Sequence, residues 1–334
     1  MMNILLTSVG RRSYLVKYFK EALKEYNGKV HVANSTNISP AFNVADKCVV
    51  TPLIYSDFYI SFLLKYCMEN SINAIISLFD ADLPILSKHK KEFENIGVKV
   101  LVSDEKVIHV CNDKWEMYNF MRNNQINVPK TYINIEDFKK DMIFPVILKP
   151  RWGMGSIGIY TAEDLYELNI LYKKVKKEIE SSYLKYESKQ TSDSMVLIQE
   201  KLVGTEYGLD VINDLNGKYK NTIVKQKLAM RAGETDVAQV IKNDDLTKIG
   251  EKISKLMNHI LNMDIDVFFS NGKFYILDMN ARFGGGYPFS HIAGVNLPKA
   301  ILRWLNNENV PESFFRVEIG VCSHKDIEIV KINK

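Results

Sequence analysis

The prediction of the fold starts from the segment Phe144-Pro-Val-Ile-Leu-Lys-Pro-Arg-Trp-Gly-Met-Gly-Ser-Ile-Gly-Ile159. Its glycines fit the pattern G-x-G-x-x-G, which alone gives weak support for a dinucleotide site. A Rossmann loop opens a helix directly after the glycines, whereas here Ile157-Gly-Ile-Tyr160 continues as a strand. No Gly-Lys-Ser/Thr follows, which excludes a P-loop. We therefore predict a β-hairpin with a glycine-rich turn, then a helix that begins at Thr161 with a T-x-x-D cap.

A glycine-rich hairpin can fold over phosphate groups, because glycine lets backbone N–H groups come close to an anion. Lys149, at the end of the incoming strand, would bring positive charge to the same phosphates. On this segment alone, an ordinary flexible hairpin with a surface lysine remains open. The candidate phosphate-binding residues are Lys149, Gly153, Gly155, Ser156 and Gly158.

A second segment, Asp266-Val-Phe-Phe-Ser-Asn-Gly-Lys-Phe-Tyr-Ile-Leu-Asp-Met-Asn-Ala-Arg282, predicts another hairpin, since Ser-Asn-Gly is a strong turn between apolar runs. The turn brings Asp266 and Asp278 to neighbouring strands, and Asn280 projects on the same face as Asp278. Such oxygen ligands hold Mg²⁺ together with ATP phosphates. Arg282 extends the row and could meet negative charge on a transferred phosphoryl group. Solvated hairpin charges are the alternative, but the following Phe-Gly-Gly-Gly favours a site.

A third segment has an apolar strand that ends in Gln199-Glu-Lys201, after which Gly204 turns the chain into Glu206 and a new strand. Exposed backbone groups at such a hinge can hydrogen-bond the adenine edge of a nucleotide. A carboxylate just beyond the hinge can accept hydrogen bonds from ribose hydroxyls. Taken alone, this segment indicates little.

The first hundred residues alternate apolar strands with amphipathic helices, which predicts a parallel sheet covered by helices on both faces. The predicted strands are Asn3–Thr7, Val30–Ala33, Cys48–Val50, Ala74–Phe79 and Val98–Val102, and the predicted helices include Asp57–Glu69 and Leu83–Glu94. Later in the chain we predict helices over Lys106–Asn123, Glu163–Glu187 and Leu297–Asn306, and strands over Glu206–Ile212 and Asn221–Leu228.

Loops at the carboxyl ends of parallel strands are where ligands normally bind. Arg11 and Arg12 follow the first strand, where arginines and backbone N–H groups could hold an anion. Asp80 and Asp82 follow the strand Ala74–Phe79, and helix capping is the alternative role for these aspartates.

Composition excludes several classes of protein. The 334 residues are 46% hydrophobic and 25% charged with a net charge of +4, so we expect a globular enzyme without a nucleic-acid partner. The four cysteines, which lie far apart, predict neither a zinc site nor a disulfide framework. The N-terminus lacks a signal-peptide pattern, and no apolar stretch approaches the ~20 residues of a membrane span, so we expect a reduced, cytoplasmic protein.

In this order, the three segments resemble the ATP-grasp superfamily, and most closely its members similar to the large subunit of carbamoyl-phosphate synthase. The most specific motifs are Ile147-Leu-Lys-Pro150 with its glycine loop, Asp278-Met-Asn-Ala-Arg282, and Arg282-Phe-Gly-Gly-Gly-Tyr-Pro288. The resemblance implies a mixed α/β and α+β fold in three parts, with ATP between the last two. These are an N-terminal Rossmann-like α/β domain (1–110), a small lid subdomain (111–200) and a C-terminal α+β subdomain with the Mg²⁺-ATP site (201–334).

The resemblance also implies roles position by position. Lys114 and Lys149 match two phosphate-binding lysines, and Glu206 matches the ribose-binding carboxylate. The adenine hinge matches Glu200, Lys201 and Val203, and the metal ligands match Asp266, Asp278 and Asn280. The family usually has Glu where Asp278 stands and Pro where Ala281 stands, so the number of metal ions, Mg²⁺ or in its place Mn²⁺, stays open.

The implied reaction activates a carboxylate as an acylphosphate with Mg²⁺-ATP and then couples it to a nitrogen nucleophile, an amino acid or an amine. Arg282, Arg231 and Lys149 are the catalytic candidates, and Arg11, Arg12, Asp80 and Arg231 are the candidates for holding substrate. For Arg231, a surface ion pair is the alternative. An ATP-grasp phosphotransferase and a non-catalytic ATP-binding regulator remain open, while a dehydrogenase would rest only on the glycine pattern. Family members are often dimers, which makes a homodimer an open expectation.

Overall fold

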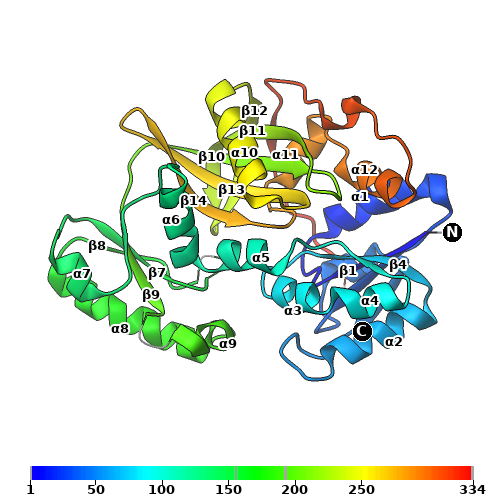
Figure 1. Cartoon of the computed structure of the whole chain (residues 1–334), viewed down its shortest axis with the longest axis horizontal. Helices are drawn as coiled ribbons and strands as arrows, with labels where there is room; N and C mark the ends of the chain where they lie inside the picture. Colours follow the sequence, from blue (N-terminus) through cyan, green and yellow to red (C-terminus); the bar gives the residue numbers. More distant parts are fainter. Residues whose placement is uncertain (1, 154, 156, 192–193, 332–334) are drawn as a thin grey trace.

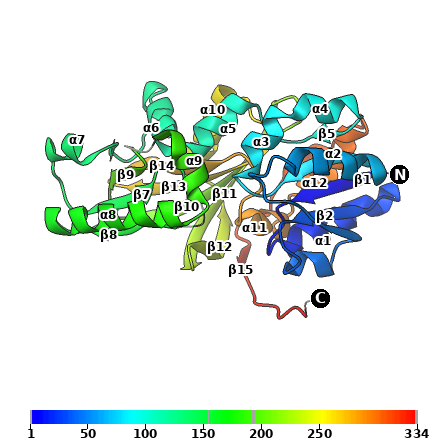
Figure 2. The ribbon, with the colours of Figure 1, turned by 90° about the horizontal axis from the view of Figure 1, so that it is seen from below.

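The computed structural model describes residues 2–153, 155, 157–191 and 194–331, and these residues form three sheets. The parallel sheet and the four-stranded sheet lie at opposite ends of the molecule (Figure 1). The six-stranded sheet lies between and above them in that view, and the view from below shows the same separation (Figure 2). The chain therefore folds into an α/β region followed by two α+β regions, each built around one sheet.

The first sheet is parallel, with strand order β3-β2-β1-β4-β5, and helices cover both of its faces. Leu5 and Ile75 are buried in the core on one face, while Ile4, Leu6 and Ile76 are buried in the core on the other. This confirms the predicted N-terminal architecture. Its elements are β1 (Asn3–Thr7), α1 (Ser13–Leu23), β2 (Val30–Asn34), β3 (Lys47–Val50), α2 (Tyr59–Glu69), β4 (Ile72–Ser77), α3 (Asp82–Lys88), α4 (Lys90–Asn95) and β5 (Lys99–Val100).

The second sheet is antiparallel, with strand order β6-β9-β7-β8, and it contains the predicted glycine-rich hairpin. The helix after this hairpin begins at Leu165 with Asp164 as its N-cap, so the predicted start at Thr161 is wrong. Thr161 lies in a strand because Val146 pairs with Ala162, whose side chain is buried. The elements are β6 (Thr131–Tyr132), α7 (Ile135–Lys139), β7 (Val146–Pro150), β8 (Tyr160–Ala162), α8 (Leu165–Ser181), α9 (Leu184–Ser188) and β9 (Val196–Glu200).

The third sheet is antiparallel, with strand order β14-β13-β10-β11-β12-β15. Apolar side chains from one face of its strands pack against α5, α6 and α10. The elements are α5 (Glu105–Asn112), α6 (Lys114–Asn123), β10 (Thr205–Asn213), β11 (Tyr219–Arg231), β12 (Glu234–Ile241), α10 (Asp244–Met257), β13 (Leu261–Ser270), β14 (Lys273–Asn280), α11 (Tyr287–Ile292), α12 (Leu297–Leu305) and β15 (Cys322–His324). Short 3₁₀ turns cover Lys24–Tyr26, Pro40–Asn43, Lys189–Thr191 and Glu312–Phe315. Among the described residues, no helix is long and apolar enough to cross a membrane.

Three helices predicted as single elements are each broken in two. Leu83–Glu94 is interrupted at His89, and Glu163–Glu187 is interrupted after Ser181. Lys106–Asn123 is interrupted at Asp113, whose extended backbone ends α5 and begins α6. The Asp113 carboxylate accepts hydrogen bonds from the backbone N–H groups of Trp115 and Glu116, which is the usual way to cap a helix. This break puts Lys114 in the first turn of α6.

Candidate active site

The charged face of the six-stranded sheet carries the predicted metal ligands. In the β13–β14 pair, Asp266 lies opposite Asp278 and Asp264 lies opposite Asn280. Because side chains alternate along a strand, these four project from the same face, while Ile265 and Met279 between them are buried in the apolar core. The predicted juxtaposition of two carboxylates and an amide is therefore present on neighbouring strands.

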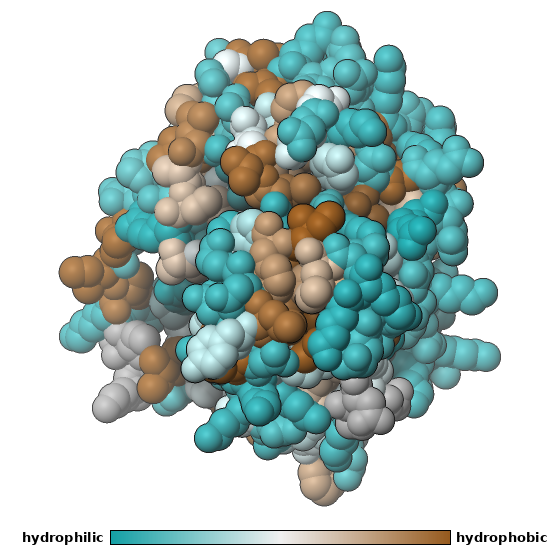
Figure 3. Space-filling view, turned by 90° about the vertical axis from the view of Figure 1, so that its left-hand side faces the viewer, coloured by the Kyte–Doolittle hydropathy of each residue, from teal (hydrophilic) through white to brown (hydrophobic). Residues whose placement is uncertain are grey.

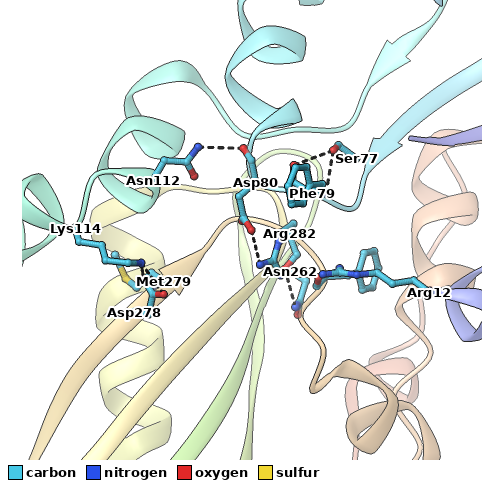
Figure 4. Close-up of polar contacts among 11 residues, drawn as sticks. Arg12, Ser77, Phe79, Asp80, Asn112, Lys114, Asn262, Asp278, Met279 and Arg282 are labelled. Atoms are coloured by element: carbon cyan, nitrogen blue, oxygen red, sulfur yellow. Dashed lines mark hydrogen bonds and ion pairs between the residues drawn. The ribbon is translucent and has the colours of Figure 1, made fainter. Parts of the chain in front are cut away.

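Two lysines from other parts of the chain reach this face. The Nζ atom of Lys114 donates to both carboxylate oxygens of Asp278, at 2.7 and 2.8 Å, as Figure 4 shows. Lys149, on β7, donates from Nζ to Oε1 of Gln199 at 2.9 Å. Burial, followed by repulsion from Lys114, lowers the pKa of Lys149 to about 8. The two lysines predicted to bind phosphate thus lie near the same carboxylate.

Lys227 is a third lysine of this site, which the sequence motifs did not single out. Its Nζ lies 2.6 Å from Oε1 of Glu206 and 2.6 Å from Oδ1 of Asp266. Gly208 lies beside its stem, since a Cβ added there would meet Cε of Lys227 at 3.5 Å. The period-2 spacing of lysines in Lys225-Gln-Lys227 was the available signal, because it puts both ammonium groups on one face of β11. We refer to Lys114, Lys149, Lys227, Glu206, Asp266 and Asp278 as the lysine–carboxylate cluster.

Arg282 lies at the contact between the N-terminal domain and the six-stranded sheet. Its guanidinium donates to Oδ2 of Asp80 at 2.6 Å, and Asp80 is 4% exposed (Figure 4). Arg12 donates to the backbone oxygen of Phe283 at 2.6 Å, which places a second guanidinium beside this pair. Burial lowers the pKa of Arg12, whereas Asp80 raises the pKa of Arg282 against the opposing effect of its own burial.

Several polar atoms around Arg282 are buried without a hydrogen-bond partner. Among the described side chains they include Nε of Arg282, Oδ1 of Asp80 and Oδ1 of Asn262. Asn262 also donates to Asp210 and to the backbone oxygen of Arg282. Because unpaired buried polar atoms are rare and costly, these three atoms show that hydrogen bonding at this contact between the domains is incomplete among the described side chains.

Asp264 and Gly284 lie at the base of the same face. Burial, followed by repulsion from Asp266, raises the pKa of Asp264 to about 6. A Cβ added at Gly284 would lie 2.1 Å from Cγ of Asp264, so only glycine leaves this carboxylate its space. The first glycine of the Phe-Gly-Gly-Gly run is therefore required to make room for the Asp264 carboxylate.

Other predicted residues lie apart from the lysine–carboxylate cluster. Arg231 does not reach it: the guanidinium pairs with Asp236, and the Arg231 side chain is 44% exposed, so the structure shows the ion pair that the sequence left open. Asp82 is fully buried and accepts hydrogen bonds from Thr7, Ser77 and Tyr59, which is a structural role. Arg11 is exposed beside Arg12.

The predicted adenine hinge follows β9. Glu200 lines a groove of about 470 Å³ together with Tyr118, Val128, Lys130 and Tyr275. The backbone N–H of Lys201 donates to the backbone oxygen of Pro145, and Val203 is 80% exposed. Figure 3 looks onto this end of the molecule, where apolar side chains gather in the middle of a mostly polar face. Gly153, Gly155 and Gly158 lie in the β7–β8 connection, and Ser156 lies outside the described residues.

Comparison with known protein families matches two parts of the chain. Residues 4–101 match the model of the PylC-like N-terminal domain, and residues 192–324 match the model described as ATP-grasp in the biosynthetic pathway with Ter operon. The protein carries an ATP-grasp domain behind a PylC-like N-terminal domain. The resemblance found in the sequence motifs is thereby confirmed, and the site lies on the sheet that belongs to the ATP-grasp domain.

Two curated relatives are similar to nearly the whole of this chain at low identity. The carbamoyl phosphate synthase large chain of Clostridium botulinum is 23% identical over 332 residues, which cover 93% of this chain but only 29% of that protein. The same enzyme chain of Campylobacter jejuni is 23% identical over 310 residues, covering 87% of this chain and 27% of that protein. This chain therefore spans less than a third of the length of these relatives.

Solved structures with the same fold include several ATP-grasp enzymes. One is the biotin carboxylase domain dimer of the Hydrogenobacter thermophilus 2-oxoglutarate carboxylase with MgADP, ADP and bicarbonate (TM-score 0.73, 17% identity, 96% of this chain, 73% of that chain). Another is the L-amino acid ligase of Bacillus licheniformis (TM-score 0.67, 17% identity, 95% of this chain, 78% of that chain). At these identities the likeness establishes the fold of the ATP-grasp protein, which agrees with the predicted fold class.

The lowered pKa of Lys149 gives a pH prediction for this ATP-grasp protein. We expect ADP to bind more weakly as the pH rises above 8, because the ammonium group that would pair with phosphate then loses its proton. The fall should approach tenfold per pH unit, measured by calorimetric titration between about pH 6.5 and 9.5. Lys149→Arg keeps its charge throughout and should flatten the profile. An unchanged profile in that variant would show that another group titrates.

Proposed function

We propose that the protein is an ATP-dependent carboxylate–amine ligase, which activates a carboxylate as an acylphosphate and couples it to a nitrogen nucleophile. The observation that carries the proposal is the lysine–carboxylate cluster on the charged face of an ATP-grasp sheet, with Arg282 beside it. Phosphoryl transfer needs positioning and neutralisation of charge more than it needs a single base. The cluster supplies lysines that can neutralise the charge of phosphates and carboxylates that can position a metal ion.

The residues present fit a Mg²⁺-nucleotide complex. Mg²⁺ usually binds one or two carboxylates together with phosphate oxygens, rather than a complete cage of protein ligands. Within the described part of the chain, no group of three His, Cys, Asp or Glu side chains is placed to hold a metal by itself. Asp266, Asp278 and Asn280 would hold the ion, which would neutralise charge on the phosphates. Lys114 and Lys149 would bind those phosphates.

Substrate would lie between the domains, beside Arg282. The unpaired Nε of Arg282 is suited to an anion such as an acylphosphate, while the unpaired oxygens of Asp80 and Asn262 are suited to the N–H groups of a nucleophile. Arg12, and Arg11 next to it, would hold a further acidic group. In this proposal residues 1–110 contribute substrate contacts, residues 111–200 cover the nucleotide, and residues 201–334 hold the metal and the reacting groups. The glycines of the β7–β8 connection would cover the phosphates, and the hinge after β9 would contact adenine.

Phosphate release from Mg²⁺-ATP against a matrix of amino acids, hydroxy acids and amines tests the proposal. We expect ADP and phosphate to appear only with a particular acid–amine pair, and Asp278→Asn to lower the rate at least about 10³-fold because it removes a metal ligand. Asp214→Asn is the matched control, since Asp214 pairs with Lys220 in the turn that joins β10 and β11, outside the cluster.

The outcomes separate the alternatives. A phosphorylated product formed with one substrate, without an amine, would make the protein a phosphotransferase. Bound nucleotide without turnover across the matrix would make it a nucleotide-binding regulator. Equal loss of activity in Asp278→Asn and in Asp214→Asn would argue against a special role for the β14 carboxylate.

A further inference from the structure

Every carboxylate of the lysine–carboxylate cluster is paired with a lysine of the same cluster. Lys114 occupies both oxygens of Asp278, and Lys227 bridges one oxygen of Glu206 and one oxygen of Asp266. The cluster contains three lysines and three carboxylates, so its formal charge is zero when Lys149 is protonated. The lysine ammonium groups thus lie against the carboxylates that are proposed to bind metal.

We infer that the ammonium groups of Lys114 and Lys227 occupy the carboxylates to which a divalent metal ion would bind. They therefore prevent a free metal ion from binding, and the ion binds only together with nucleotide. The inference rests on the proposed function of the site. It assigns to Lys227 a positioning role: Lys227 orients Glu206 and Asp266 through one oxygen each and leaves the second oxygen of each for nucleotide and metal.

Electrostatic repulsion is the first reason why metal alone would not bind at the cluster. A divalent ion beside Asp266 and Asp278 would come within a few ångströms of two ammonium groups, which repel it more strongly in a partly buried site than in water. The side chains of Lys114 and Lys227 are 9% and 7% exposed, so neither can turn freely into solvent. Metal alone would have to displace a buried ammonium group and leave it without a partner, which is costly.

Nucleotide removes this obstacle by an exchange of partners. When phosphate oxygens arrive with the metal, Lys114 can move from Asp278 to a phosphate while the metal takes Asp278. The complex brings an anion for the lysine and a cation for the carboxylate, so no buried charge is left unpaired. Lys227 can stay in place, because Asp266 keeps one oxygen for it and offers the other to the metal.

Mn²⁺ binding to the full chain, followed by electron paramagnetic resonance with and without ADP, tests the inference. Wild type is expected to bind Mn²⁺ only when ADP is present. Lys114→Met and Lys227→Met should each bind Mn²⁺ without ADP at least about tenfold more tightly than wild type, because each frees a carboxylate from its lysine and removes a positive charge that repels the metal ion. Lys220→Met is the matched control: it removes a β11 lysine that pairs with Asp214 outside the cluster, and it should behave as wild type.

Two results would overturn the inference. One is wild-type binding of Mn²⁺ without nucleotide that Asp278→Asn abolishes. The other is the absence of any gain in metal-only binding in the folded lysine variants. If Lys114→Met does not fold, Lys227→Met decides alone. Failure of wild type to bind ADP, with or without Mn²⁺, would instead contradict the proposed function, while the measurements with metal alone would still decide between the lysines and another barrier.

Discussion

Replacing Arg282 by methionine is expected to lower the rate of the coupled reaction about 10²–10³-fold while ADP binding changes little. The guanidinium lies next to Asp80 rather than in the lysine–carboxylate cluster, so it is placed to contact the reacting groups and not the bound nucleotide. Its Nε has no hydrogen-bond partner and could donate to negative charge that develops on the reacting groups. A donor that gains its full interaction only in the transition state lowers kcat and not affinity.

The measurement is steady-state ADP release together with calorimetric ADP binding. Arg282→Met leaves Asp80 without its partner, so thermal unfolding of the variant must also be recorded. Arg282→Met combined with Asp80→Asn removes the stranded carboxylate and should restore stability but not activity. Arg316→Met, at an exposed position away from the site, is the surface control. Equal losses of activity and ADP affinity in the Arg282 variant would show that the residue acts through folding.

Elements whose signal is local could be predicted from the sequence. The hairpin at Ser270-Asn-Gly272 follows from its turn residues, and the parallel N-terminal sheet follows from strands such as Asn3–Thr7, whose five residues are all buried. The helix breaks could not be predicted in the same way. Lys106–Asn123 has continuous helical spacing, and the residue that stabilises the break, Arg151, is far away in the sequence.

The site also contains residues whose positions follow from local sequence and residues whose positions depend on distant parts of the chain. Asp266, Asp278 and Asn280 could be placed on one face because strand register and a two-residue spacing determine their positions. Their partners could not be identified, because Lys114 meets Asp278 across 164 residues of sequence and Lys227 meets Asp266 across 39. Only the packing of separate elements brings these charges together. Arg231 differs, because it pairs with Asp236 only five residues away in the β11–β12 hairpin, which is the surface ion pair that the sequence left open.

Asp113→Ala is expected to destabilise the protein by about 3–5 kcal/mol, the largest effect on stability that we predict for a single substitution. The carboxylate is fully buried and binds Arg151 through two hydrogen bonds, from Nε at 2.8 Å and from Nη2 at 2.7 Å. Removing it leaves Arg151, whose side chain is 11% exposed, without this carboxylate and also removes the cap of α6. The midpoint of urea unfolding measures the loss.

Asp164→Ala is the control, because Asp164 caps α8 through Glu167 N–H without a buried ion pair and should cost only about 1 kcal/mol. Asp113→Ala with Arg151→Leu removes both charges and should recover part of the loss. The double variant should still bind ADP more weakly than wild type, because Asp113 fixes the first turn of α6 and thereby the position of Lys114. Full recovery of ADP binding would mean that Lys114 is positioned by its contact with Asp278 rather than by the helix start.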